Sequence, residues 1–200
     1  MALLKLGDEA ILNFAEGSTR AQLCQVFYQP AVEHVLKQGH WKFARRRAAL
    51  AELLPVPTFE WGHRYALPTD PYCLQAVRLV DGFPSTALPA QFLFDDLINT
   101  VEIPWVIEGR ELLTDVAPAY LVYTARITDT SQFTGDFVGC LAEYLAAELA
   151  YAVTGNANTQ QARYQMYEQK LAEAKHNNGR EGTPPRYKLN GVFRDVRRGY

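Results

Sequence analysis

The sequence has little net charge and few cysteines. Its 200 residues include 20 Lys and Arg against 22 Asp and Glu, a formal charge of −2. A general nucleic-acid coat protein is strongly basic, so this balance argues against that class while leaving room for a local basic patch. The cysteines Cys24, Cys73 and Cys140 form no C-x-x-C pair, and no histidine lies at zinc-ligand spacing from them. We expect a reduced chain without a disulfide framework or a structural metal.

The sequence also lacks a long hydrophobic run without charges and lacks the common catalytic motifs. The most apolar stretch, 137–153, contains Glu143 and Glu148, which favours a buried helix over a membrane span. Asp8 and Glu9 interrupt the N-terminal apolar residues, so a secretory signal peptide is not expected there. G-x-S-x-G, P-loop, dinucleotide and H-E-x-x-H patterns are absent. We therefore expect no catalytic residue, no metal and no cofactor.

Apolar residues make up 48% of the chain, enough for a substantial core, and their spacing divides it into three zones. In the first zone, apolar residues at 3, 6, 10 and 11 predict a short amphipathic helix. Ser18 is a good N-cap for a second helix that ends at Gly39, and Pro30 predicts a kink or break within it. The buried face of this second helix is predicted to hold Ala21, Cys24, Tyr28, Ala31 and Val35.

The middle zone, about 41–128, holds eight of the eleven prolines, a density that excludes long helices. It predicts five strands, at 74–80, 91–97, 100–107, 111–114 and 119–127. The last alternates clearly, with residues 121, 123, 125 and 127 on one face. Glu108-Gly109-Arg110 predicts a hairpin turn between two of the strands.

The third zone returns to helix. Residues 129–131 are predicted to cap its entry, and Phe137, Leu141, Leu145 and Leu149 recur every four residues after Phe133. Gly155 ends this helix, and a last one is predicted over 158–175 with Tyr164, Tyr167, Leu171 and Ala174 on one face. From Asn177 onward the composition predicts a flexible spacer with a sticky end.

The early and late helices need each other, because none can bury its apolar stripe alone. The predicted fold class is therefore α+β. A mainly α-helical bundle (1–40 and 129–176) carries an inserted small β domain (41–128) and an extended, flexible C-terminal docking tail (177–200).

Two groups of residues are candidates for partner binding. The tail ends in aromatic and basic side chains suited to docking on a partner protein: Phe193, Arg194, Arg197, Arg198 and Tyr200. A basic run beside Trp41 could face a partner or DNA: Lys42, Arg45, Arg46 and Arg47. A frayed terminus and a solvated edge are the simpler interpretations of the two groups.

Two other function classes stay open from the residues alone. A hydrolase needs two carboxylates in one cleft, for which Asp95, Glu102, Glu108 and Asp115 are candidates. A DNA-binding module would use the basic run, with an affinity that falls steeply as salt is added.

Five segments, in fixed order from residue 2 to about residue 175, carry a resemblance to a known family. The first is ALLKLG (2–7) with AEGSTRA (15–21), and the second is C-x-x-x-YQPA (24–31) leading through VL (35–36) to HWKFARR (40–46). The third is YALPTD (65–70) before a strand, and the fourth is LLTD (112–115) with YLVY (120–123). The fifth is TD (128–129) followed by FTGDF (133–137), LA (141–142), LAAELA (145–150) and TG (154–155). Together they resemble the tail tubular protein A family, the head-to-tail adaptors (connectors) of short-tailed phages. His40 departs from the proline that commonly precedes the tryptophan, and the last twenty-five residues have no counterpart.

The resemblance implies a structural, non-enzymatic virion protein located at the head–tail junction after synthesis in the host bacterial cytoplasm. Such adaptors assemble as a ring, usually of twelve copies, below the portal protein. The ring extends the DNA channel and offers a platform for a downstream tail or nozzle protein. The implied partners are therefore portal, tail protein, further copies of the chain, and genomic DNA that passes without sequence-specific binding. No membrane partner is implied.

Overall fold

The structure is a computed structural model that describes residues 1–39, 41–81 and 103–180. It combines helices with two antiparallel sheets, which confirms the predicted α+β class. The helices are α1 (Ala2–Lys5), α2 (Thr19–Gln38), α4 (Gly135–Thr154) and α5 (Ala157–Arg180), with short 3₁₀ turns η1 (Lys42–Ala44) and η3 (Thr130–Gln132). The strands are β1 (Arg45–Ala49), β2 (Ala51–Glu52), β3 (His63–Ala66), β4 (Cys73–Val80), β5 (Trp105–Glu108), β6 (Glu111–Thr114) and β7 (Tyr120–Ala125).

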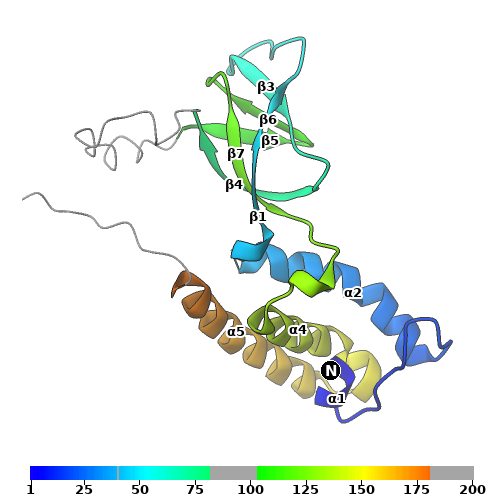
Figure 1. The fold of residues 1–200 in the computed structure, drawn as a ribbon. Helices are drawn as coiled ribbons and strands as arrows, with labels where there is room; N and C mark the ends of the chain where they lie inside the picture. Colours follow the sequence, from blue (N-terminus) through cyan, green and yellow to red (C-terminus); the bar gives the residue numbers. More distant parts are fainter. Residues whose placement is uncertain (40, 82–102, 181–200) are drawn as a thin grey trace, which may run out of the picture.

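Helices from both ends of the sequence form one layer, at the bottom of Figure 1, with the sheets above it. α4 lies at its centre and packs against α1, α2 and α5. Half of its residues are buried, because it has neighbours on several sides. α4 is also the one described helix long and apolar enough to cross a membrane, but 56% of that window is buried inside the fold. A core helix has the same properties.

The ends of α2 and α4 follow from local sequence. The Ser18 hydroxyl accepts a hydrogen bond from the Ala21 amide at 3.1 Å, as predicted for an N-cap. α4 begins instead at Thr134, whose hydroxyl accepts from the Phe137 amide, so the predicted cap at 129–131 is wrong. Asp129 instead caps η3, the short 3₁₀ turn that precedes α4 in the chain. Gly155 ends α4 in the left-handed conformation that glycine adopts without strain.

Three other predictions in the helical zones need correction. α1 stops at Lys5, because Gly7 has a φ of 77° that ends the helix before residues 10 and 11. α2 is one continuous helix through Pro30, so the predicted break is wrong. Pro30 and Val26, whose carbonyl loses its helical partner to the proline, are both exposed, so water can hydrate that carbonyl. α5 extends to Arg180, so the predicted spacer does not begin at Asn177. The Asn177 side chain donates to Asp136 at 3.2 Å and stabilises that last turn.

The strands form two sheets. The first sheet has the order β1-β7-β4 and the second has the order β2-β3-β6-β5, with all neighbours antiparallel. The predicted strands at 74–80, 111–114 and 119–127 correspond to β4, β6 and β7, and the predicted hairpin turn joins β5 to β6. β1, β2 and β3 were not predicted. Only the end of the predicted strand 100–107 is seen, as β5, and the strand 91–97 lies outside the described residues.

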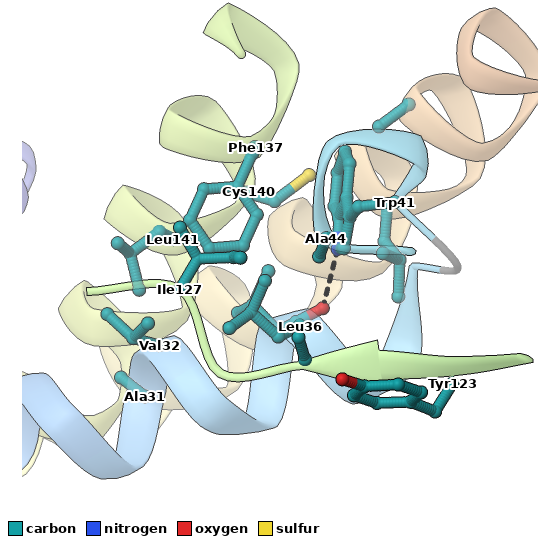
Figure 2. Close-up of a cluster of buried hydrophobic side chains, with 14 of the residues drawn as sticks. Ala31, Val32, Leu36, Trp41, Ala44, Tyr123, Ile127, Phe137, Cys140 and Leu141 are labelled. Carbon is teal, nitrogen blue, oxygen red and sulfur yellow. Dashed lines mark hydrogen bonds between the residues drawn. The ribbon is translucent and has the colours of Figure 1, made fainter. Parts of the chain in front are cut away.

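Trp41 joins the two parts of the fold. Its side chain is 2% exposed, and its indole N–H donates to the Val35 carbonyl at 2.7 Å, a group the end of α2 leaves without a helical partner (Figure 2). The Phe137 ring meets it edge-on at 5.2 Å, and Phe43 meets Phe137 in the same way at 5.3 Å. The chain therefore leaves α2 in a fixed direction toward β1.

Candidate functional site

The predicted basic run lies on the first sheet and is divided by the pleat of β1. Arg45 and Arg47 share one face, and Arg46 points to the other, because neighbouring residues in a strand alternate. Arg47 pairs with Val122 on β7, which pairs in turn with Arg78 on β4, so Arg78 shares the face of Arg47 about 10 Å away. We call Arg45, Arg47 and Arg78 the arginine face. The strands of this sheet contain no acidic residue.

Arg46 and Lys42 are placed differently. The Arg46 guanidinium donates to the Phe43 carbonyl at 2.7 Å and to the Arg45 carbonyl at 3.0 Å, and reaches Gln132 at 3.3 Å. This network holds the turn between η1 and β1, so we assign Arg46 a structural role. Lys42 lies in η1, where its backbone amide donates to Asn178 at 3.2 Å. The run therefore presents two of its four cations, Arg45 and Arg47, on the arginine face. The third member of that face, Arg78, comes from a separate strand, β4.

An apolar tip projects from the loop between β2 and β3. Leu54, Val56 and Phe59 are 81%, 49% and 74% exposed within six residues. Large side chains at such exposure concentrated in one loop are typical of an interaction surface. The segment LLPVPTF (53–59) was not predicted as a candidate site, although it carries a usable signal. Its two prolines disfavour a regular helix or a central strand, so its apolar side chains have no regular element to bury them.

The apolar tip is held by hydrogen bonds at its base. The Arg64 guanidinium donates to the Leu54 carbonyl at 3.0 Å, and the Gly62 amide donates to Asp115 at 2.8 Å. The Leu53 amide donates to the Arg64 carbonyl at 2.8 Å. A loop fixed in this way loses little conformational freedom when a partner binds.

An apolar groove lies at the other end of the molecule, among α1, the loop that follows it, α2 and α4. Its volume is about 360 Å³. Its walls include Leu3 from α1, Phe14 from the loop, Tyr28 from α2, and Leu141 and Leu145 from α4. Buried Glu143 ties α1 to α4, because it accepts from the Lys5 ammonium at 2.6 Å and lies 3.5 Å from the Arg163 guanidinium. The groove is thus framed by elements that are fixed to one another.

The carboxylates proposed for a hydrolase are only partly described. Asp95 and Glu102 lie outside the described residues. Glu108 sits at the turn of the β5–β6 hairpin opposite Glu111, and Asp115 follows the far end of β6. Glu108 and Asp115 are therefore separated by the length of four strand residues, about 14 Å. This distance exceeds the separation of the two catalytic carboxylates in both retaining and inverting glycosidases. Asp115 instead accepts the Gly62 amide.

A cluster of aromatic and charged side chains joins α2, α4 and α5. The His34 ring stacks on Tyr144, with centroids 4.3 Å apart, and the Tyr164 hydroxyl donates to Glu148 at 2.7 Å. Burial, with the hydrogen bond to Glu148 added, raises the pKa of Tyr144 to about 12. Burial also raises the pKa of Tyr164 and Tyr167 and lowers the pKa of His34. The imidazole of His34 and the phenols of the three tyrosines are therefore neutral at about pH 7, and we assign the cluster a packing role between the three helices.

These shifts predict alkaline instability. In the unfolded chain the phenols ionise near pH ~10, whereas Tyr144 in the folded chain keeps its proton to higher pH. The folded state then binds more protons, so the stabilising contribution is complete below pH ~10 and is lost as the pH rises. Urea unfolding at about pH 9 and about pH 11 measures the loss, and Tyr144→Phe should reduce it. Tyr151→Phe, at a 61% exposed position, is the control. Equal losses in all three proteins would contradict the prediction.

The remaining candidate residues, Phe193, Arg194, Arg197, Arg198 and Tyr200, lie outside the described residues, and their docking role stays a prediction. Within 1–39, 41–81 and 103–180, no group of three or more His, Cys, Asp or Glu side chains is arranged to hold a metal ion. No protein-family model matches the chain, and no curated protein sequence matches it.

Proposed function

We propose that this chain is a structural head-to-tail adaptor of a tailed phage or phage-like particle. It would form a ring of about twelve copies below the portal, extend the DNA channel and carry the next tail component. The observation that carries the proposal is the separation of the apolar tip, which lies in the loop before β3, from the apolar groove, which lies beside α1. Figure 1 shows β3 and α1 at opposite ends of the fold. A protein that joins two assemblies needs interaction surfaces on opposite sides.

The placement of the resembling segments supports the same proposal. The HWKFARR segment supplies Trp41 and Phe43, and the last segment runs along α4 around Phe137. These two aromatics meet Phe137 at 5.2 and 5.3 Å. Two segments separated by about 90 residues therefore form one core contact. This is expected if the five segments together specify a fold, and it is not expected if each is an unrelated short similarity.

The test is assembly on the portal protein. The full chain, mixed with portal from the same particle, should form a ring visible by electron microscopy along its axis. A chain truncated after Arg180 keeps α5 complete and should stay folded but fail to dock. Phe59→Ser removes an exposed apolar side chain and should still dock on portal but lose the next tail component. If the full chain neither binds portal nor forms a ring, the adaptor function is wrong. If the truncated chain binds portal as strongly as the full chain, the docking role of the C-terminal tail is wrong, but the adaptor function can stand.

The arginine face favours a second candidate function, direct contact with DNA at the neck. Three guanidiniums on one face of a sheet whose strands carry no acidic residue could bind phosphates whatever the base sequence. The logarithm of the association constant for duplex DNA should then fall linearly with the logarithm of the salt concentration. The double variant Arg47→Ala, Arg78→Ala should reduce the magnitude of that slope by about two. Weak binding without any salt dependence would exclude this role.

A further inference from the structure

A charged cleft lies between α2 and the sheets, and it shares no lining residue with the apolar groove and none of the three arginines of the arginine face. Its volume is about 250 Å³, and the cleft is lined by residues of α2, of β4 and of the β5–β6 turn, together with Arg126 after β7. Three cationic side chains and one carboxylate line it: Lys37, Arg110 and Arg126 with Glu33. The cleft therefore has a charge excess of two, in a chain whose total charge is −2.

Two of these cations are held against a single aromatic ring. The guanidinium carbon of Arg110 lies 4.1 Å from the centre of the Tyr72 ring, and that of Arg126 lies 4.4 Å from it. Arg110 donates to the carbonyls of Cys73 and Pro68, both at 2.8 Å, which fixes its position. Two like charges gathered at one half-buried ring repel each other, and this is costly unless a negative group neutralises them.

Glu33 supplies only part of that neutralisation. Its carboxylate lies 2.9 Å from an Arg126 nitrogen. The Nε–H of Arg126 is buried and has no hydrogen-bond partner among the described residues. A buried donor without a partner is uncommon in folded proteins, and a bound water or ion is one way in which such a donor is satisfied. Lys37 is exposed on the cleft rim, where its ammonium can reach a ligand without leaving solvent.

We propose that this cleft binds a phosphate group in its dianionic form, as inorganic phosphate or as the phosphate of a small monoester. A phosphate dianion matches the excess of two positive charges, whereas a carboxylate or a phosphodiester carries only one negative charge. Arg110 supplies a positive charge at a fixed position, because its two terminal nitrogens already donate to backbone carbonyls, and Arg126 and Lys37 supply further charge-assisted donors to the phosphate oxygens. The site bridges α2 to the β5–β6 turn and stands independently of the adaptor proposal.

The test is calorimetric titration of the full chain with inorganic phosphate, at constant ionic strength. Saturable binding is expected, with sodium chloride and acetate giving none. Lys37→Met should weaken binding about tenfold, the effect of losing one charged hydrogen bond. Lys175→Met, an exposed lysine on α5, should leave it unchanged. Glu33→Gln removes the competing carboxylate and should strengthen binding, a gain that a purely structural role would not produce.

Adenosine monophosphate identifies the source of the phosphate. If it competes with inorganic phosphate, the cleft accepts monoesters, and if it does not, the ligand is the free ion. The proposal fails if phosphate shows no saturable heat, if acetate binds equally well, or if Lys37→Met and Lys175→Met behave alike. None of these results depends on portal binding, so the adaptor function can stand or fall separately.

Discussion

Trp41→Ala is expected to lower the free energy of unfolding by about 4 kcal/mol or more, among the largest effects of any single substitution in the chain. Removing a buried aromatic side chain costs about 3–5 kcal/mol through lost contacts and the cavity that remains. Trp41 is 2% exposed and packs edge-on against Phe137. The substitution also leaves the Val35 carbonyl without the indole donor at 2.7 Å, which adds about 1–3 kcal/mol. Trp41→Phe keeps an aromatic ring and should lose much less.

Gly39→Ala tests the packing of the Trp41 ring by adding a methyl group where the ring lies. A Cβ at position 39 would overlap Cε2 and Nε1 of the Trp41 ring, so either the ring or the end of α2 must move. Overpacking of this kind costs about 1–3 kcal/mol. The matched control is Gly139→Ala inside α4, where a Cβ meets nothing within 4 Å. That control should stabilise the chain by about 0.5–1 kcal/mol, because alanine favours a helix over glycine.

Urea unfolding, followed by far-UV circular dichroism, gives the free energies for these four variants. The expected order of stability is Gly139→Ala, the unmodified chain, Trp41→Phe, and then Trp41→Ala as the least stable. Gly39→Ala should lie below the unmodified chain. A Trp41→Ala protein as stable as the unmodified chain would mean that the junction between α2 and η1 is not a core contact.

The helices were predictable from sequence because their signals are local. Ser18 and Gly155 act on the backbone within four residues, and the four-residue spacing of apolar side chains identifies the buried stripe of α4. The errors lie at ends set by other forces. Gly7 ends α1 early through its positive φ, and Asn177 extends α5 through a contact with Asp136, 41 residues away in the sequence.

The strands β1, β2 and β3 were missed because pairing over long distances stabilises them. β1 reads RRRAA, without the branched and aromatic residues that favour strands, and it is ordered by its ladder with β7, about 75 residues later. The arginine face could not be predicted for the same reason, since the register that aligns Arg47 with Arg78 passes through Val122. The paired cations on Tyr72 likewise come from separate elements. Sequence supplied the residue types, and only topology brings them together.

Leu149→Asp is expected to unfold the chain or to cost about 5 kcal/mol. Leu149 lies at the centre of the helical layer and is 0% exposed. A carboxylate there loses its hydration and has to stay neutral or force the helices apart. Substitutions that bury an unpaired charge belong to the small class whose effects exceed about 4 kcal/mol.

Leu145→Asp, one turn earlier, separates burial from helix propensity. Leu145 is 8% exposed and borders the apolar groove, where water can reach a carboxylate, so its loss should be smaller than that of Leu149→Asp. Tyr151→Asp carries the same charge on an exposed face of the same helix and should change the free energy of unfolding by less than about 1 kcal/mol. Thermal melts of the three proteins rank them directly. Similar losses for all three would show that the charge acts on α4 as an isolated helix, and the contacts of α4 with α1, α2 and α5 would then not be the source of its stability.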